Sequence, residues 1–276
     1  MEADGQPRRL VCLVRGPRQW SWDVHWEWAV SSLGIPYTIL SWGQLDSTAA
    51  LNVVVDWGEW WQGRINAEYL PTTYIAVDPW GLDGRHVTNI RMLRPRCIYT
   101  ACRPDIDLPH TVRSMPNSAE WPPDVKRVPW ADRDIKVGFV GSPSSVRVAL
   151  KQTSPPDWRF VLTTTPVREA MMLYGRSRIV FNENRHNDTN VRNFEALAAG
   201  AVLVTGPSVD ADLGLMDSVN CFIYSDVREA YDTLRRVASL PSGRLRDVAM
   251  EGYRLWQQRH QTRTRLHQIL VDHDLL

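Results

Sequence analysis

The hydrophobic positions of this chain gather into short runs that are separated by polar or amphipathic segments. In the first half, runs rich in β-branched residues occupy 8–16, 37–42, 51–58, 72–78 and 96–101. Each run has about the length of one buried strand and is predicted to form one. The segment 20–33 is predicted to be the first crossover helix, because Gly34 and Pro36 follow it as helix-ending residues.

The second half alternates strands and helices more regularly. Strands are predicted at 134–142, 158–165, 178–182, 201–206 and 220–226. Helices are predicted at 145–152, 165–177, 190–200, 227–240 and roughly 243–270. Strands that alternate with helices and lack hairpin turns form parallel sheets, so both halves are predicted to be doubly wound α/β domains.

A proline-rich stretch at 115–134 separates the two halves and has no hydrophobic period. Such a composition is typical of a linker. We therefore expect an N-terminal Rossmann-like domain over 1–130 and a C-terminal Rossmann-like domain over 131–276, with the last helix able to pack back on the first domain.

Composition narrows the class of protein. The chain has 276 residues, 43% hydrophobic and 23% charged, with a formal net charge of +1. These values are typical of a globular protein with a sizeable core, and there is no basic excess of the kind that announces nucleic-acid binding. The cysteine spacing fits neither a zinc knuckle nor a redox pair. Apolar runs are too short for a signal peptide or a membrane span, so a cytoplasmic protein is expected.

Nine polar residues, "NENRHNDTN" at 182–190, lead directly into a helix-like apolar segment. Asn190 is a plausible N-cap and Gly200 a residue that ends the helix. Val191, Phe194, Leu197 and Ala198 have the spacing of a face against the sheet, and Arg192 and Glu195 share the other face. A helix N-terminus with an added arginine suits a phosphate, and a glutamate one turn later can accept hydrogen bonds from a ribose. The simpler reading is a capped helix with a surface ion pair.

The segment 174–210, "YGRSRIVFNENRHNDTNVRNFEALAAGAVLVTGPSVD", resembles the signature of the CgeB-like glycosyltransferases, a branch of the group 1 glycosyl transferases with the GT-B fold. The segment 134–147, "DIKVGFVGSPSSVR", resembles the strand and glycine turn of the same family. The resemblance runs in order over most of 70–270 and is specific over 134–206.

The resemblance implies an enzyme with two Rossmann-like domains facing a cleft, which transfers a sugar from a nucleotide donor, usually a UDP-sugar. It implies that Glu195 holds the ribose, that Gly141 and Ser142 approach the diphosphate, and that Arg192 is the basic residue at the helix start. It implies no metal and no cofactor besides the nucleotide-sugar. Relatives carry a further glutamate at the position of Asn187. The remaining donor-side candidates, several of which are predicted to face the sugar, are Asn182, Glu183, Asn187, Asp188 and Asn190.

The first half carries most of the tryptophans, which can build a core or stack on sugars and bases. The acceptor-side candidates are Trp57, Trp60, Trp61 and Trp80. An inverting enzyme needs a base near the acceptor hydroxyl. Asp78 is the first choice for that base, followed by His86 and His25, although each can equally be a capping or solvated residue.

Two classes of function remain open. The first is a nucleotide-sugar glycosyltransferase, and the alternative is a non-catalytic nucleotide-binding or interaction protein on the same fold. The acceptor can be a glycan, a protein or a small molecule. The short chain, with its tryptophan- and arginine-rich first domain, is also similar to viral enzymes that glycosylate hydroxymethylated bases in DNA, which would have to flip the target base into a pocket. The near-zero net charge argues against a DNA acceptor.

Overall fold

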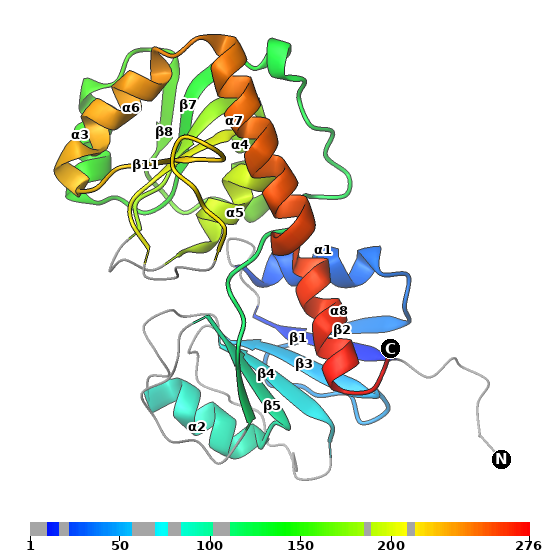
Figure 1. The fold of residues 1–276 in the computed structure, drawn as a ribbon. Helices are drawn as coiled ribbons and strands as arrows, with labels where there is room; N and C mark the ends of the chain where they lie inside the picture. The colour runs from blue at the N-terminus through cyan, green and yellow to red at the C-terminus, as the bar shows by residue number, and fades with distance from the viewer. Residues whose placement is uncertain are drawn as a thin grey trace. The chain divides into compact units, whose positions relative to one another are not determined.

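The chain folds into two α/β units, each with its own parallel sheet (Figure 1). Unit 1 comprises 1–18, 23–116 and 263–276, and unit 2 comprises 19–22 and 117–262. The predicted boundary between 130 and 131 therefore lies inside unit 2. The computed structural model describes residues 10–16, 22–56, 70–76, 84–101, 111–184, 189–208 and 213–276.

The described part of unit 1 contains a parallel sheet with the strand order β2-β1-β3-β4-β5-β6. Its strands are β1 (Val11–Arg15), β2 (Tyr37–Ser41), β3 (Leu51–Asp56), β4 (Thr72–Ala76), β5 (Cys97–Thr100) and β6 (Thr111–Ser114). Its helices are α1 (Asp23–Ser32), α2 (Gly84–Leu93) and α8 (Thr262–Asp272), the last of which begins at the junction with unit 2. Strands β3 and β4 are buried along their whole length, as their apolar runs predict.

The C-terminal helix α8 is anchored to the sheet of unit 1 through Asp272. Tyr99 in β5 donates a hydrogen bond of 2.6 Å to one carboxylate oxygen, and Arg113 in β6 lies 2.5 Å from the other. The Asp272 side chain is only 8% exposed. Burial alone would raise the pKa of Asp272, but the hydrogen bond from Tyr99 and the charge of Arg113 hold it below its usual value.

The described part of unit 2 contains a parallel sheet with the order β11-β10-β9-β7-β8. Its strands are β7 (Ile135–Val140), β8 (Trp158–Val161), β9 (Ser177–Phe181), β10 (Val202–Thr205) and β11 (Phe222–Ile223). Its helical elements are η2 (Trp130–Asp132), α3 (Ser145–Thr153), α4 (Val167–Arg176), α5 (Val191–Ala198), η4 (Val227–Glu229), α6 (Ala230–Ala238), α7 (Ser242–Leu255) and the π-helix η5 (Trp256–His260).

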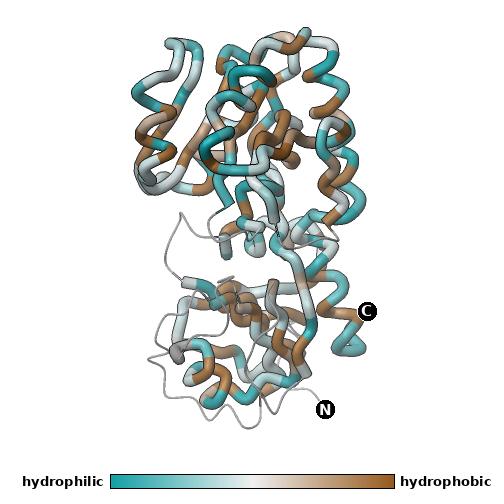
Figure 2. The backbone as a smooth tube through the Cα atoms, turned by 60° about the vertical axis from the view of Figure 1, so that its left-hand side comes forward, coloured by the Kyte–Doolittle hydropathy of each residue, from teal (hydrophilic) through white to brown (hydrophobic). Residues whose placement is uncertain are grey.

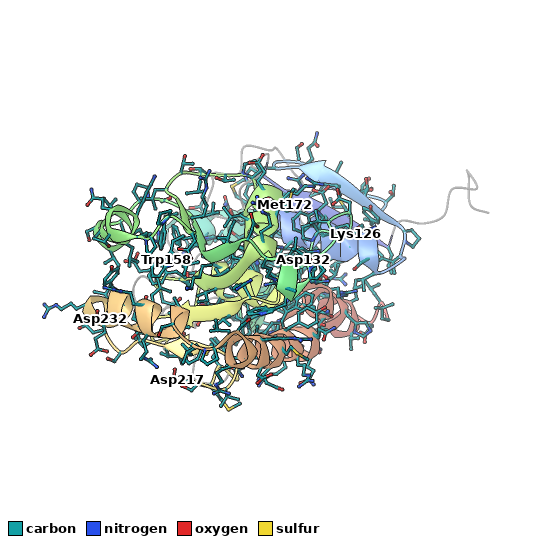
Figure 3. The ribbon with its side chains drawn as sticks, turned by 90° about the horizontal axis from the view of Figure 1, so that it is seen from above. Lys126, Asp132, Trp158, Met172, Asp217 and Asp232 are labelled. Atoms are coloured by element: carbon teal, nitrogen blue, oxygen red, sulfur yellow. The ribbon has the colours of Figure 1, made fainter. Side chains whose placement is uncertain are left out.

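Helices cover both faces of the sheet in unit 2. On one face, alternate strand residues such as Phe139 and Phe181 form a core with apolar residues of α3, α6 and α7. On the other face, α4 packs so closely on β7 that a Cβ at Gly138 would lie 2.8 Å from Leu173. In Figure 2 the strands are the most hydrophobic segments of the unit, and in Figure 3 the charged side chains Lys126, Asp132, Asp217 and Asp232 lie at the surface.

A buried arginine closes the C-terminal end of α5. The Arg133 guanidinium donates hydrogen bonds of 2.8 Å to the carbonyl oxygens of Ser177, Ala199 and Gly200. Its side chain is buried, and the loss of hydration together with the charges of Arg127 and Arg178 lowers its pKa to about 10. A cation at this position satisfies carbonyl groups that the helix leaves without intrahelical donors.

The structure differs from the sequence-based expectation at three places. Helix α2 and strand β6 had no predicted counterpart. The single helix predicted over 243–270 is divided, because Gln261 adopts an extended conformation and forms a parallel bridge with Ala119. The bridge uses the carbonyl of His260 as an acceptor for the Ala119 amide, which ends the helical hydrogen-bond ladder there.

Candidate functional site

The strand order of unit 2 creates a switch point between β7 and β9. The chain runs from β7 to β8 on one side and then returns to β9 on the other side. At such a point the loops leaving two neighbouring strands diverge, and ligands of doubly wound proteins bind outside these carboxyl ends. The residues at this edge are Val140 at the end of β7, Gly141 directly after it, and Asn182 directly after β9.

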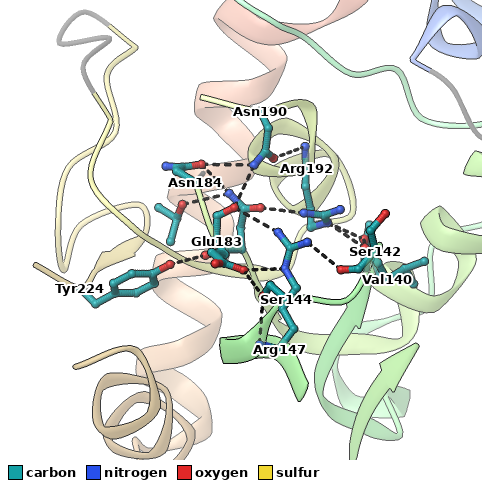
Figure 4. Close-up of polar contacts among 12 residues, drawn as sticks. Val140, Ser142, Ser144, Arg147, Glu183, Asn184, Asn190, Arg192 and Tyr224 are labelled. Atoms are coloured by element: carbon teal, nitrogen blue, oxygen red, sulfur yellow. Dashed lines mark hydrogen bonds and ion pairs between the residues drawn. The ribbon is translucent and has the colours of Figure 1, made fainter. Parts of the chain in front are cut away.

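Arg192, in the first turn of α5, reaches to this edge of the sheet (Figure 4). Its Nε donates to the carbonyl of Val140 at 3.0 Å and to the hydroxyl of Tyr174 at 3.1 Å. Its Nη1 donates to the Asn182 side-chain oxygen at 3.0 Å. All three acceptors are neutral, and in the described parts of the chain no carboxylate pairs with Arg192. Its guanidinium is therefore held in place by neutral acceptors, without an ion-pair partner among the described residues.

Gly141 provides the space into which this guanidinium fits. A Cβ at position 141 would lie 2.5 Å from Arg192 Nη2 and 3.1 Å from the Phe139 ring. The residue also has a φ of +154°, which side-chain-bearing residues rarely adopt. Glycine is thus required here both by the backbone conformation and by the close approach of Arg192.

A second arginine lies beside the same turn. Arg147 in α3 is buried and forms an ion pair of 2.8 Å with Glu183, which also accepts a hydrogen bond of 2.7 Å from Ser144. Arg147 donates to the carbonyl of Ser142 as well, at 2.9 Å. The guanidinium carbons of Arg147 and Arg192 lie 4.8 Å and 4.7 Å from the centroid of the Phe139 ring. Two cationic groups therefore flank the glycine turn, and only one of them has a carboxylate partner among the described residues.

A network of buried amides supports the edge of the sheet. Asn182 and Asn193 are fully buried and are hydrogen-bonded to each other at 2.9 Å. Both also donate to the side-chain oxygen of Asn184, and the Thr205 hydroxyl donates to Asn193 at 2.8 Å. The amide of Asn184 donates in turn to the carbonyl of Gly206. The loop after β9 is therefore fixed to both α5 and β10.

Burial controls the ionisation of Tyr174, whose hydroxyl accepts a hydrogen bond from Arg192. Loss of hydration raises the pKa of Tyr174 to about 12; the charge of Arg192 opposes this rise and the charge of Glu195 adds to it. The phenol is therefore neutral at physiological pH and donates to the carbonyl of Val140 at 3.2 Å while it accepts from Arg192.

The start and end of α5 follow the sequence pattern. Asn190 is the N-cap, and its side chain accepts from the amide of Arg192 at 3.1 Å. Gly200 has a φ of +63°, as expected for the residue that ends the helix. Glu195 is only 6% exposed. Asn187 and Asp188 lie outside the described residues.

One expectation for this helix is corrected, and the simpler reading of a surface ion pair does not hold. Val191 and Phe194 pack with Ala119 and Leu213 rather than on the sheet, because the segment containing Ala119 crosses next to α5. Arg192 and Glu195 do not form an outward-facing surface pair, since Arg192 turns toward Val140 and Glu195 is buried.

Some residues of this site were not identified from the sequence. They are Ser144, Arg147, Tyr174, Asn193 and Thr205. The clearest available signal was the spacing of Ser144 and Arg147, because an N-cap serine accepts from the amide three residues later, here at 3.2 Å. Nothing in the local pattern indicates that Arg147 meets Glu183.

In unit 1, His86 belongs to a fully buried polar cluster at the carboxyl end of β3. Its Nδ1 lies 2.9 Å from the Tyr74 hydroxyl and 3.3 Å from a carboxylate oxygen of Asp56. The same carboxylate oxygen accepts from Tyr74 and, at 2.8 Å, from Asn89. Because the phenol donates to the carboxylate, His86 Nδ1 is best assigned as the protonated nitrogen, which leaves Nε2 as the basic one.

Of the other predicted residues of unit 1, only His25 lies in the described part of the chain. His25 is buried in α1 with its ring edge-on to Trp28, at a centroid distance of 5.2 Å. Asp78 and the four acceptor-side tryptophans, Trp57, Trp60, Trp61 and Trp80, lie outside the described residues. In the described ranges, no three histidine, cysteine, aspartate or glutamate side chains gather in a metal-binding arrangement. Nor does any helix in those ranges have the length and apolar character needed to cross a membrane.

Comparison with known families identifies the chain. The model of a family described as glycosyl transferase-like matches residues 129–271, which is more than half of the chain. This chain belongs to that glycosyl transferase-like family. The resemblance to the group 1 glycosyl transferases that the sequence predicts is therefore confirmed, and the matched span includes the whole site around Arg192.

Solved structures show the fold of this glycosyltransferase. A sucrose-phosphate synthase from Thermosynechococcus elongatus is similar, with a TM-score of 0.62, 8% identity and coverage of 96% of this chain and 99% of the other. An alpha-glucosyltransferase in complex with UDP has a TM-score of 0.58, 8% identity and coverage of 96% and 99%. The Anabaena protein HepE in complex with UDP and glucose has a TM-score of 0.57, 11% identity and coverage of 97% and 100%. The predicted GT-B fold is confirmed. The sequence has no significant match among curated proteins.

Proposed function

We propose that this glycosyltransferase moves a sugar from a UDP-sugar to an acceptor hydroxyl. The family membership supports sugar transfer, and UDP is present in two of the three similar structures described above. The observation that carries the proposal is the Arg192 guanidinium, which has no carboxylate partner among the described residues and is held against the glycine turn at the switch point of unit 2.

The donor diphosphate is proposed to bind at Gly141 and Ser142, opposite Arg192. Arg192 is an ion-pairing donor without a described carboxylate partner, and guanidinium groups match phosphate oxygens well. The first turn of α5 adds the partial positive charge of a helix N-terminus. Arg147 is proposed as a second cation beside the diphosphate, with Glu183 as its partner in the absence of donor.

Glu195 is proposed to hold the ribose hydroxyls, one turn further along α5. The front of the loop, from Glu183 to Asp188, is proposed to face the donor sugar. The carboxylate of Glu183 is 14% exposed and is shared between Arg147 and Ser144, so a sugar hydroxyl would meet a carboxylate of fixed orientation.

The transfer step requires negative charge on the departing diphosphate to be stabilised. A fixed cation in a partly desolvated site does this without reorganisation of solvent, and this supports a metal-independent reaction. Arg192 is well suited because three hydrogen bonds already fix its guanidinium before any donor is present.

The acceptor side of the proposal rests on unit 1. His86 is a candidate for the general base, and it lies in the described part of the chain. Its Nδ1 lies beside the Asp56 carboxylate and the Tyr74 hydroxyl, an arrangement that would make Nε2 the proton acceptor. Asp78 and His25 remain alternatives for that role, and the tryptophans at 57, 60, 61 and 80 are proposed to contact the acceptor. A hydroxymethylated base in phage-type DNA is one candidate acceptor, beside glycans, proteins and small molecules.

A donor and acceptor screen read by mass spectrometry tests this proposal. The full-length protein is incubated with UDP-sugars and other nucleotide-sugars, alone and with simple alcohols, glycans or hydroxymethylated DNA. Release of UDP, or a hexose mass added to an acceptor, is expected for the wild type and should be lost in Arg192→Gln. UDP binding without turnover of any donor would favour a non-catalytic nucleotide-binding protein.

A further inference from the structure

The Asn182 amide is the link between Arg192 and the buried network behind it. Its Oδ1 accepts from Arg192 Nη1 at 3.0 Å. Its Nδ2 lies near three acceptors, at 2.7 Å from Asn184 Oδ1, 2.9 Å from Asn193 Oδ1 and 3.2 Å from Thr205 Oγ1. The residue is fully buried and its polar atoms are all engaged. Because it is fully buried, the Asn182 side chain is not accessible to a donor substrate.

These contacts fix which way round the amide lies. If the amide were turned over, Nδ2 would face the donor Nη1 of Arg192, and Oδ1 would face the two amide oxygens. That arrangement replaces hydrogen bonds by repulsive contacts, so the orientation with Oδ1 toward Arg192 is the satisfied one. The network thus presents an acceptor to the guanidinium.

Asn193 helps to fix the orientation of the Asn182 amide, although the Asn193 side chain is not itself a hydrogen-bond partner of Arg192 among the described contacts. Its Oδ1 receives Asn182 Nδ2 and the Thr205 hydroxyl, and its Nδ2 is used by Asn184. Asn193 is fully buried. It therefore has no direct route to a ligand, and any effect on ligand binding must pass through Asn182.

We infer that Asn182, Asn193 and Thr205 are positioning residues that orient Arg192 toward the donor diphosphate. The inference rests on the proposed function, which places a diphosphate at Arg192. Nε is held by Val140 and Tyr174, and Nη1 is held by Asn182. With these two nitrogens fixed, Nη2 lies beside Gly141, where the diphosphate is proposed to bind.

The test is the ratio of affinities for UDP and uridine, measured by calorimetry on the full-length protein. Only UDP carries the diphosphate, so damage to the general fold weakens both ligands, whereas misplacement of Arg192 weakens UDP selectively. Asn193→Leu should lower the ratio about tenfold, because a charge-assisted hydrogen bond loses its oriented acceptor.

Thr205 offers a milder pair of variants that keeps the test available if Asn193→Leu does not fold. Thr205→Ser retains the hydroxyl and should keep the wild-type ratio, whereas Thr205→Val removes it and should lower the ratio. Asn220→Leu is the matched control. Asn220 is another buried amide, which donates to the carbonyl of Gly214 and accepts from the amide of Met216. Its replacement should cost stability and leave the ratio unchanged.

Arg192→Gln separates the inference from the proposed function. If this variant loses the preference for UDP and the network variants lose it too, the positioning role is supported. If Arg192→Gln loses the preference while Asn193→Leu and Thr205→Val retain it, the positioning role is wrong and the donor site stands. If Arg192→Gln itself keeps the preference, the diphosphate does not bind there and both fail.

Discussion

The close approach of Gly141 and Arg192 gives a quantitative test of the site. In Gly141→Ala, the new Cβ would lie 2.5 Å from Arg192 Nη2, so the guanidinium must move. Movement breaks at least the hydrogen bond to Asn182, which is worth about 1.5–3 kcal/mol for a charged group. The φ of +154° adds a backbone cost of about 1–3 kcal/mol for a residue with a side chain. The expected loss of unfolding free energy is about 2.5–6 kcal/mol.

A double-mutant cycle separates these two contributions. Arg192→Ala removes the group that the new methyl meets, so Gly141→Ala should then cost only the backbone part, about 1–3 kcal/mol. The coupling between the two substitutions should be about 1.5–3 kcal/mol, measured from urea unfolding followed by circular dichroism.

Gly34→Ala is the matched control for the backbone term. Gly34 has a φ of +67° and no atom within 4 Å of an added Cβ. Its replacement should cost about 1–2 kcal/mol whether or not Arg192 is present. If Gly141→Ala costs the same in the wild type and in Arg192→Ala, the guanidinium does not occupy the place described here.

Three further predictions concern the ribose contact, the end of α5 and the C-terminal helix. Glu195→Ala should abolish donor turnover with an unchanged circular dichroism spectrum, and near-normal kinetics would refute its assignment to the ribose. Arg133→Met should lower the unfolding free energy by about 3 kcal/mol or more, because buried carbonyl groups lose their hydrogen-bond donor. Replacement of the exposed Arg235 should change it by no more than about 0.5 kcal/mol. Equal effects of the two substitutions in urea unfolding would contradict the capping role of Arg133. The lowered pKa of Asp272 means that its stabilising effect is present above about pH 4, the unfolded value, and is lost as the pH falls through the folded value. Asp272→Asn should therefore lower the melting temperature at pH 7, and a difference from wild type that persists at pH 2 would show that the charge is not responsible.

The local sequence pattern was sufficient to predict the strands and the helix that carry the site. The apolar runs predicted β7, β9 and β10 to within a few residues, because a strand buried on both faces must be apolar throughout. Asn190 and Gly200 marked the ends of α5, because capping depends on residues only a few positions apart. The match to a glycosyl transferase-like family was visible in the same segment.

Contacts between segments that are distant in the sequence could not be predicted from the local pattern. Arg192 binds a carbonyl 52 positions away, and Arg147 meets Glu183 across 36 positions. Periodicity shows which side of a helix is polar. Which group then contacts that side depends on the order of the strands in the sheet. Here the order places β7 beside β9 and turns Arg192 inward, where the pattern had indicated an outward face.

The sequence by itself determined the fold class, the position of the donor motif and the ends of its helix, because these depend on local spacing and on capping. Only the tertiary structure decided which polar groups support which. The carboxylate of Glu183 is paired with Arg147, Asn182 and Asn184 after β9 are hydrogen-bonded within the protein, and Arg192 has no carboxylate partner among the described residues. These outcomes follow from burial, because a buried polar group needs a hydrogen-bond partner. That partner can come from a distant part of the chain, so the local sequence does not identify it.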